Sequence, residues 1–178
     1  MPLALDNEWA YIDAQGSGGI SIRIYDTLKF LQKFVYGQDT IYVSPEQTYY
    51  TNRSDGLWIK NYGSSNTLLA KYPAKPGDIF GYDSFVLTSQ TSPDPIDTGY
   101  ANIVVDSINA NVTVPAGNYT CYKYNADYYD SKHLLLYRQN AYYAVNVGLI
   151  KRESFSLDSA SKQLKLNDSY QLTKALLH

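Results

Sequence analysis

Apolar and polar residues alternate along most of this chain, most clearly between residues 108 and 124. Every second residue from 108 to 114 is apolar, as expected for a strand with one buried face. The alternation stops at Pro115 to Gly117 and resumes from residue 119. Proline removes a backbone donor and glycine permits positive φ, so this stretch predicts a bulge or sharp bend. A bend of this kind curls an antiparallel sheet toward a half-barrel.

The same period-2 pattern recurs on both sides of this stretch. His133 to Arg138 and Tyr142 to Ile150 predict two further strands, and Glu8 to Asp13 with Ile20 to Tyr25 predicts a hairpin near the N-terminus. Thr27 to Tyr36 fits both the strand and the helix period. We expect it to be β because strands surround it, with a short helix as the alternative.

About a dozen short strands, spaced roughly every 8–12 residues, predict an all-β fold. The expected architecture is a single strongly curved antiparallel sheet, a half-barrel or open barrel. No linker or internal repeat divides the sequence, so residues 1–178 are expected to form one domain. A chain of 178 residues buries about 70% of its unfolded surface without covalent cross-links.

Composition excludes several classes of function. The net charge is −2 and the basic residues are dispersed, which argues against binding nucleic acid. The lone cysteine, Cys121, excludes an intramolecular disulfide and any CxxC metal site, and is expected to be a small buried residue. No apolar run approaches the ~20 residues that span a bilayer, so no transmembrane segment is predicted. The N-terminal MPLALDNEW lacks the features of a signal peptide, which predicts either a cytoplasmic protein or the mature part of an exported one.

Residues suited to catalysis do not form a recognisable set. The histidines are His133 and His178, and a Cys121–His133 pair is the arrangement that nucleophilic catalysis would require. A histidine at the edge of a loop is the favoured interpretation, because active sites need several converging groups. The acidic residues fall in turns, without the paired spacing of a glycosidase. We therefore expect no enzymatic activity, no metal and no cofactor.

Pairs of adjacent tyrosines are the most informative feature for function. Neighbouring residues in a strand point to opposite faces, so each pair places one ring inward and one outward. Inward rings fill a core or line a concave pocket for an apolar ligand. Outward rings pair across strands or offer a platform for a sugar or a partner strand. The pairs are Tyr49/Tyr50, Tyr128/Tyr129 and Tyr142/Tyr143.

Three stretches carry a resemblance to a known group of proteins. They are Leu69 to Asp78 (LAKYPAKPGD), Val112 to Tyr124 (VTVPAGNYTCYKY) and Tyr142 to Glu153 (YYAVNVGLIKRE). In this order they resemble a broad group of uncharacterised exported bacterial proteins, many of them lipoproteins. The group is similar in architecture to the Lol-type lipoprotein-carrier half-barrel, a curved sheet around a hydrophobic concavity. The resemblance covers roughly residues 66 to 177.

The resemblance implies export, to the periplasm or to the outer membrane or cell surface, and implies no catalytic residues. Gly117 and Gly148 match positions whose backbone geometry favours glycine. Ala144 to Asn146 departs from the group's pattern, which has a proline there, so the local turn is expected to differ.

Pattern and resemblance together predict a non-enzymatic exported protein. Its concave face is expected to bind a lipid or other apolar ligand, or a segment of a partner protein. The alternative is a carbohydrate- or surface-binding module that uses exposed tyrosines such as Tyr128 and Tyr129. The residues predicted to line the concavity are Trp58, Val112, Val114, Tyr122, Tyr143 and Leu149.

Overall fold

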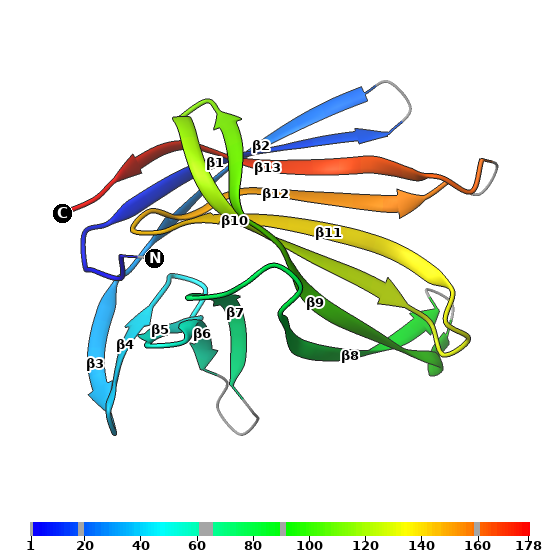
Figure 1. The fold of residues 1–178 in the computed structure, drawn as a ribbon, viewed down its shortest axis with the longest axis horizontal. Helices are drawn as coiled ribbons and strands as arrows, with labels where there is room; N and C mark the ends of the chain where they lie inside the picture. The colour runs from blue at the N-terminus through cyan, green and yellow to red at the C-terminus, as the bar shows by residue number, and fades with distance from the viewer. Residues whose placement is uncertain (1, 18–19, 61–65, 90–91, 159–160) are drawn as a thin grey trace.

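The computed structural model describes residues 2–17, 20–60, 66–89, 92–158 and 161–178. Within these residues the chain forms thirteen strands, arranged in two antiparallel sheets (Figure 1). The larger sheet contains, in spatial order, β2 (Ile20–Lys29), β1 (Glu8–Ser17), β13 (Leu164–Leu176), β12 (Gly148–Leu157), β11 (Leu135–Ala144), β10 (Gly117–Tyr129), β9 (Ser92–Val114) and β8 (Ile79–Ser89). The smaller sheet contains β3 (Gln32–Tyr36), β4 (Asp39–Val43), β5 (Tyr49–Arg53), β6 (Gly56–Lys60) and β7 (Thr67–Lys71). In these described ranges no helix is long and apolar enough to cross a membrane.

The all-β prediction is confirmed, but the prediction of a single curved sheet is wrong. The chain leaves the large sheet at Phe30, which is 1% exposed, and Leu31 N donates to Val43 O of the small sheet at 2.9 Å. It returns where Gly77 N donates to Val105 O at 2.8 Å and Val105 N donates to Asp78 O at 2.9 Å. The five strands between these two points pair among themselves, so the protein has two open sheets.

Several local predictions are corrected in the same way. Pro115 and Ala116 form the turn of a hairpin between β9 and β10, where a bend within one strand was predicted. The expected strands His133 to Arg138 and Tyr142 to Ile150 are replaced by β11, a turn at residues 145–147, and β12. Thr27 to Tyr36 is extended, as expected, but it belongs to two strands in different sheets. The N-terminal hairpin is confirmed by the pairing of β1 with β2.

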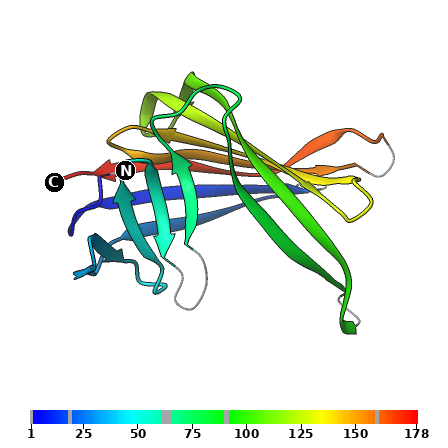
Figure 2. The ribbon, with the colours of Figure 1, turned by 60° about the horizontal axis from the view of Figure 1, so that its bottom comes forward.

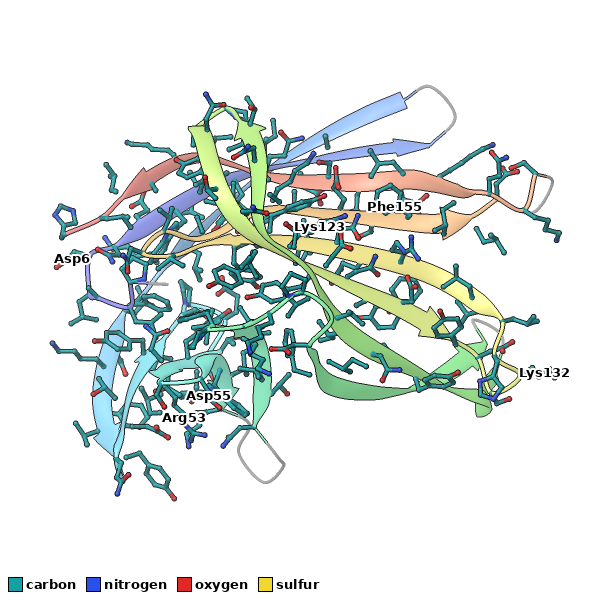
Figure 3. All side chains as sticks on the ribbon, in the orientation of Figure 1. Asp6, Arg53, Asp55, Lys123, Lys132 and Phe155 are labelled. Carbon is teal, nitrogen blue, oxygen red and sulfur yellow. The ribbon has the colours of Figure 1, made fainter. Side chains whose placement is uncertain are left out.

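The small sheet covers one end of one face of the large sheet, near the two chain termini (Figures 1 and 2). The β10–β11 connection lies at the opposite end of the large sheet (Figure 1). Figure 3 labels Arg53 and Asp55 in the small sheet and Lys132 at that far end. The uncovered part of the large sheet therefore projects beyond the small one.

Aromatic side chains fill the space between the two sheets. The Phe30 ring packs against Trp9 of the large sheet, with ring centroids 5.6 Å apart, and against Tyr42 and Tyr50 of the small sheet. Tyr124 crosses the interface, because its hydroxyl donates to Lys71 O at 2.7 Å. These contacts join the sheets through one continuous core, and they fix the position of a cleft at its edge.

Candidate functional site

A cleft of about 400 Å³ lies between the two sheets, beside the aromatic core. This volume is at the lower end of the range for small-molecule sites, ~300–1,000 Å³. Tyrosines and aliphatic residues from both sheets make up most of its wall. The tyrosines are Tyr11, Tyr50, Tyr143 and Tyr170, and the aliphatic residues are Leu28, Leu57, Ile59, Leu69 and Leu149.

Strand alternation explains how these side chains come to face the cleft. Leu57 and Ile59 are two residues apart on β6 and therefore point to the same face of the small sheet. On the large sheet, β13 lies between β1 and β12, and Tyr170 pairs in register with Arg152 of β12. Tyr11 of β1 stacks on the Tyr170 ring with centroids 4.4 Å apart. This row forms the wall of the cleft on the large sheet.

Hydrogen bonds hold the polar groups of this wall in place. The Tyr170 hydroxyl donates to Asp26 Oδ2 at 2.7 Å, and Thr27 N donates to Asp26 Oδ1 at the same distance. The Tyr11 hydroxyl donates to Leu149 O at 3.1 Å. Burial is the main factor that raises the pKa of Tyr11, Tyr143 and Tyr170, so these rings present neutral hydroxyl groups at physiological pH.

Arg152 is the basic residue among the described lining of the cleft. Its guanidinium lies over the Tyr170 ring, 5.0 Å from the centroid. Its Nε atom is buried and has no hydrogen-bond partner among the residues that the structure describes. The carboxylates that also line the cleft are Asp26, which accepts two hydrogen bonds, and Glu46 on the β4–β5 turn.

Two of the six residues predicted to contact a ligand line this cleft. They are Tyr143 and Leu149. Tyr122 lies beside it and, with Tyr143, borders a hollow of about 10 Å³, too small for more than a single water. A role for these residues in binding stays a prediction.

The other three predicted residues lie elsewhere. Val112 and Val114 are buried in the core, and Val112 also borders a shallow hollow of about 290 Å³ on the β9–β10 hairpin. Trp58 points away from the cleft, because it alternates with Leu57 and Ile59 on β6. There its indole donates to Asp55 Oδ1 at 2.9 Å, and the Arg53 guanidinium lies over its ring.

Sequence reasoning missed Arg152, Tyr170 and Asp26. Alternation along β12 does not predict the position of Arg152, because a register shift opposite Tyr142 and Tyr143 places Leu149 and Arg152, three residues apart, on the same side of the strand. Lys151 lies on the other face, where it pairs with Glu153 at 2.6 Å.

The Cys121–His133 arrangement considered for catalysis is not formed. Cys121 is fully buried in β10, and burial raises the pKa of its thiol to about 11. His133 lies in the β10–β11 turn, where its ring nitrogen Nδ1 is hydrogen bonded with the Tyr100 hydroxyl. The strand from Cys121 to Tyr129 alone spans roughly 26 Å at ~3.3 Å per residue. The two side chains are therefore at different ends of the sheet.

Two crystal structures are similar to this chain over almost its whole length. One is an exported protein with a YmcC-like fold from Bacteroides fragilis, with a TM-score of 0.62, 12% identity and coverage of 99% of this chain and 98% of that one. The other is a lipoprotein from Parabacteroides distasonis, with a TM-score of 0.57, 13% identity and coverage of 98% and 97%. The similarity is one of fold.

No protein-family profile matches the chain, and no curated protein matches it significantly. The two structures agree with the predicted resemblance to exported bacterial proteins and lipoproteins. Neither is described as a Lol-type carrier, and that part of the resemblance stays a prediction.

Proposed function

We propose that this protein is an exported, non-enzymatic binding protein that holds a small apolar ligand, or an apolar segment of a partner, in the cleft between its two sheets. The observation that carries the proposal is the cleft of about 400 Å³, because it is large enough for a small molecule and both sheets contribute to its wall. Its aliphatic and tyrosine wall suits an apolar body with few polar groups. Export is supported by the descriptions of the two structures with the same fold.

The absence of enzymatic activity belongs to the same proposal. The polar groups of the cleft are neutral tyrosine hydroxyls, two threonines, an arginine, the carboxylate of Asp26, which already accepts two hydrogen bonds, and the carboxylate of Glu46. A general acid or base needs a pKa near the working pH, and a nucleophile needs an adjacent base. The cleft supports recognition better than chemistry.

A carbohydrate-binding role is the second candidate, and it draws on the uncovered end of the large sheet. There Tyr128 stacks on Tyr137 with centroids 3.9 Å apart, and Tyr129 stacks on Tyr100 at 5.5 Å. Planar tyrosine surfaces of this kind can stack on sugar rings. Binding on a glycan array that is lost in the Tyr128→Ala variant would favour this candidate over the cleft.

Native mass spectrometry of the purified protein, before and after mild organic extraction, tests the main proposal. We expect a species that copurifies and is lost on extraction, and we expect the extracted protein to bind the neutral fluorescent probe N-phenyl-1-naphthylamine. Thr48→Trp should abolish probe binding, because Thr48 lines the cleft and a large ring there would fill it.

The matched control is Thr120→Trp, which adds the same ring at an exposed position on β10. It should bind the probe like the unmodified protein. Equal binding by both variants would place the probe outside the cleft. If the native mass shows no copurifying species and the protein does not bind the probe, the proposal is contradicted, and a protein that acts through its surface is favoured.

A further inference from the structure

We infer that the ligand of the cleft is an amphipathic acid, whose carboxylate or similar anionic group pairs with Arg152 while its apolar body lies against the leucines. This inference rests on the proposed function and goes beyond it, because it names the chemical class of the ligand and the residue that selects it. Arg152 is the one cation among the described lining residues, and a purely apolar pocket would not need it.

Arg152 is placed as an anion-binding group, and no carboxylate of the described residues forms an ion pair with it. Its Nε is buried without a hydrogen-bond partner among them. A buried charged donor without an acceptor is costly, because it loses its hydration and gains no hydrogen bond in return. The planar guanidinium matches a carboxylate with two parallel hydrogen bonds, which would satisfy it.

The nearby acidic groups do not fill this role. Asp26 accepts hydrogen bonds from the Tyr170 hydroxyl and from Thr27 N, so it orients the tyrosine on which the guanidinium rests. Asp13 pairs in register with the other side of Tyr170, so strand β13 separates it from Arg152. Glu46 comes from the β4–β5 turn of the small sheet and raises the pKa of Tyr50 there, in addition to the larger effect of burial. Among the described residues, Nε of the guanidinium is thus left for a ligand.

The rest of the wall defines the other end of the ligand. Leu57, Ile59 and Leu69 enter from the small sheet, and Leu28 and Leu149 from the large sheet. The cleft of about 400 Å³ is at the lower end of the range for small-molecule sites. This suits one medium-length acyl chain or one aromatic group, and is too small for a lipid with two long chains.

Calorimetric titration with decanoate and with 1-decanol, at pH 7 and low ionic strength, separates the contribution of the charge from that of the chain. We expect the unmodified protein to bind decanoate at least tenfold more tightly than decanol. Arg152→Gln should lose about 10- to 100-fold in affinity for decanoate, the range for a hydrogen bond to a charged group, and keep its affinity for decanol. The affinity of Arg152→Lys for decanoate should lie between those of the unmodified protein and Arg152→Gln, because lysine keeps the positive charge but cannot form two parallel hydrogen bonds with a carboxylate.

Lys151→Gln is the matched control, since it removes a cation from the neighbouring position on the opposite face of β12. It should bind both compounds like the unmodified protein. The thermal midpoint of ligand-free Arg152→Gln should fall only slightly, because the variant loses the contact with the Tyr170 ring but Nε has no acceptor to lose among the described residues. A markedly lowered midpoint together with weaker decanol binding would assign Arg152 to packing and overturn the inference.

The same titrations distinguish this inference from the proposed function. Equal binding of decanoate and decanol, unchanged in Arg152→Gln, would overturn the anionic ligand and leave an apolar cleft standing. No binding of either compound, nor of the neutral naphthylamine probe, would overturn both.

Discussion

At the scale of single residues, tyrosine supplies much of the polar chemistry in the described interior. The hydroxyls of Tyr11 and Tyr124 each donate to a backbone carbonyl on another strand, and that of Tyr170 donates to Asp26. A tyrosine buries a large apolar ring and satisfies one polar group at its end. Burial raises the pKa of all three, so these hydroxyls keep their protons, and their donor role, at every pH the protein would normally meet.

The carboxylate of Asp39 is the clearest pH-dependent contribution to stability. It accepts hydrogen bonds from Arg53 at 2.7 and 3.0 Å and forms an ion pair with Lys60 at 2.9 Å. The hydrogen bonds from Arg53 and then Lys60 hold the pKa of Asp39 well below its ordinary value, and its side chain is 14% exposed. We expect Asp39→Asn to destabilise the protein by about 1–2 kcal/mol at pH 7, between the values for exposed and buried charged pairs.

The sign of this effect follows from the lowered pKa. The stabilisation is complete above the unfolded value of about 3.9 and is lost as the pH falls toward the folded value. Urea unfolding at pH 7, 5 and 3 should therefore show a constant difference between the two proteins at pH 7 and 5 and a smaller one at pH 3. Asp106→Asn, which removes an ion pair whose carboxylate is 48% exposed, should change stability by less than ~0.5 kcal/mol. A difference for Asp39→Asn that grows toward pH 3 would contradict this account.

At the scale of elements, the β5–β6 turn depends on Gly56. This residue has φ of +147°, and a Cβ added to it would lie 2.1 Å from Ala70 O and 2.9 Å from Leu68 Cδ1. The β7 backbone would have to move away, which would break the pairing of β6 with β7. We expect Gly56→Ala to cost more than about 3 kcal/mol, or to prevent the small sheet from forming.

Gly37→Ala is the control for this change. Gly37 also has a positive φ, +63°, but no atom lies within 4 Å of an added Cβ. Gly37→Ala should lower the free energy of unfolding by about 1–2 kcal/mol, because only the left-handed backbone conformation disfavours the alanine. Urea unfolding followed by circular dichroism measures both. Equal costs for the two variants would show that the close contact at Gly56 relaxes easily.

How much of these elements could be predicted depends on the range of the interactions that decide them. Alternation identified most strands, because one face of each is buried. The turn at Pro115 to Gly117 was recognised as an interruption, but proline and glycine suit both a bend and a hairpin. The choice is made by pairing between β9 and β10, in which Thr120 meets Asn111 and Gly117 meets Val114.

The same limit applies to the candidate site. Tyr143 and Leu149 were predicted to line a concavity and both line the cleft, but alternation does not connect them, because a turn separates β11 from β12 and the pairing of these strands shifts in register. Arg152 was missed because charged residues are expected on the outer face. The second sheet was missed because the pattern is continuous through Phe30, where the chain passes from one sheet to the other. Only contacts between residues that are far apart in the sequence distinguish one long meander from two sheets.

At the scale of the whole molecule, the two sheets share one core and should unfold together. Trp9 lies in the large sheet with its indole bonded to Val147 O at 2.7 Å, and Trp58 lies on the far face of the small sheet. Urea unfolding of Trp58→Phe reports on Trp9, and that of Trp9→Phe reports on Trp58. In each variant we expect the fluorescence transition to coincide with the loss of circular dichroism, as for one cooperative domain. A separate, earlier transition for Trp58 would show that the small sheet unfolds on its own.

The burial of Cys121 has a practical consequence for a protein that is proposed to be exported. A thiol that is fully enclosed, with a pKa of about 11, contains almost no thiolate at neutral pH. In an oxidising environment, Cys121 therefore forms no disulfide with another thiol while the sheet is intact. When the sheet opens, the thiol regains ordinary reactivity. The rate at which a thiol reagent modifies the native protein therefore measures how often the large sheet opens around Cys121.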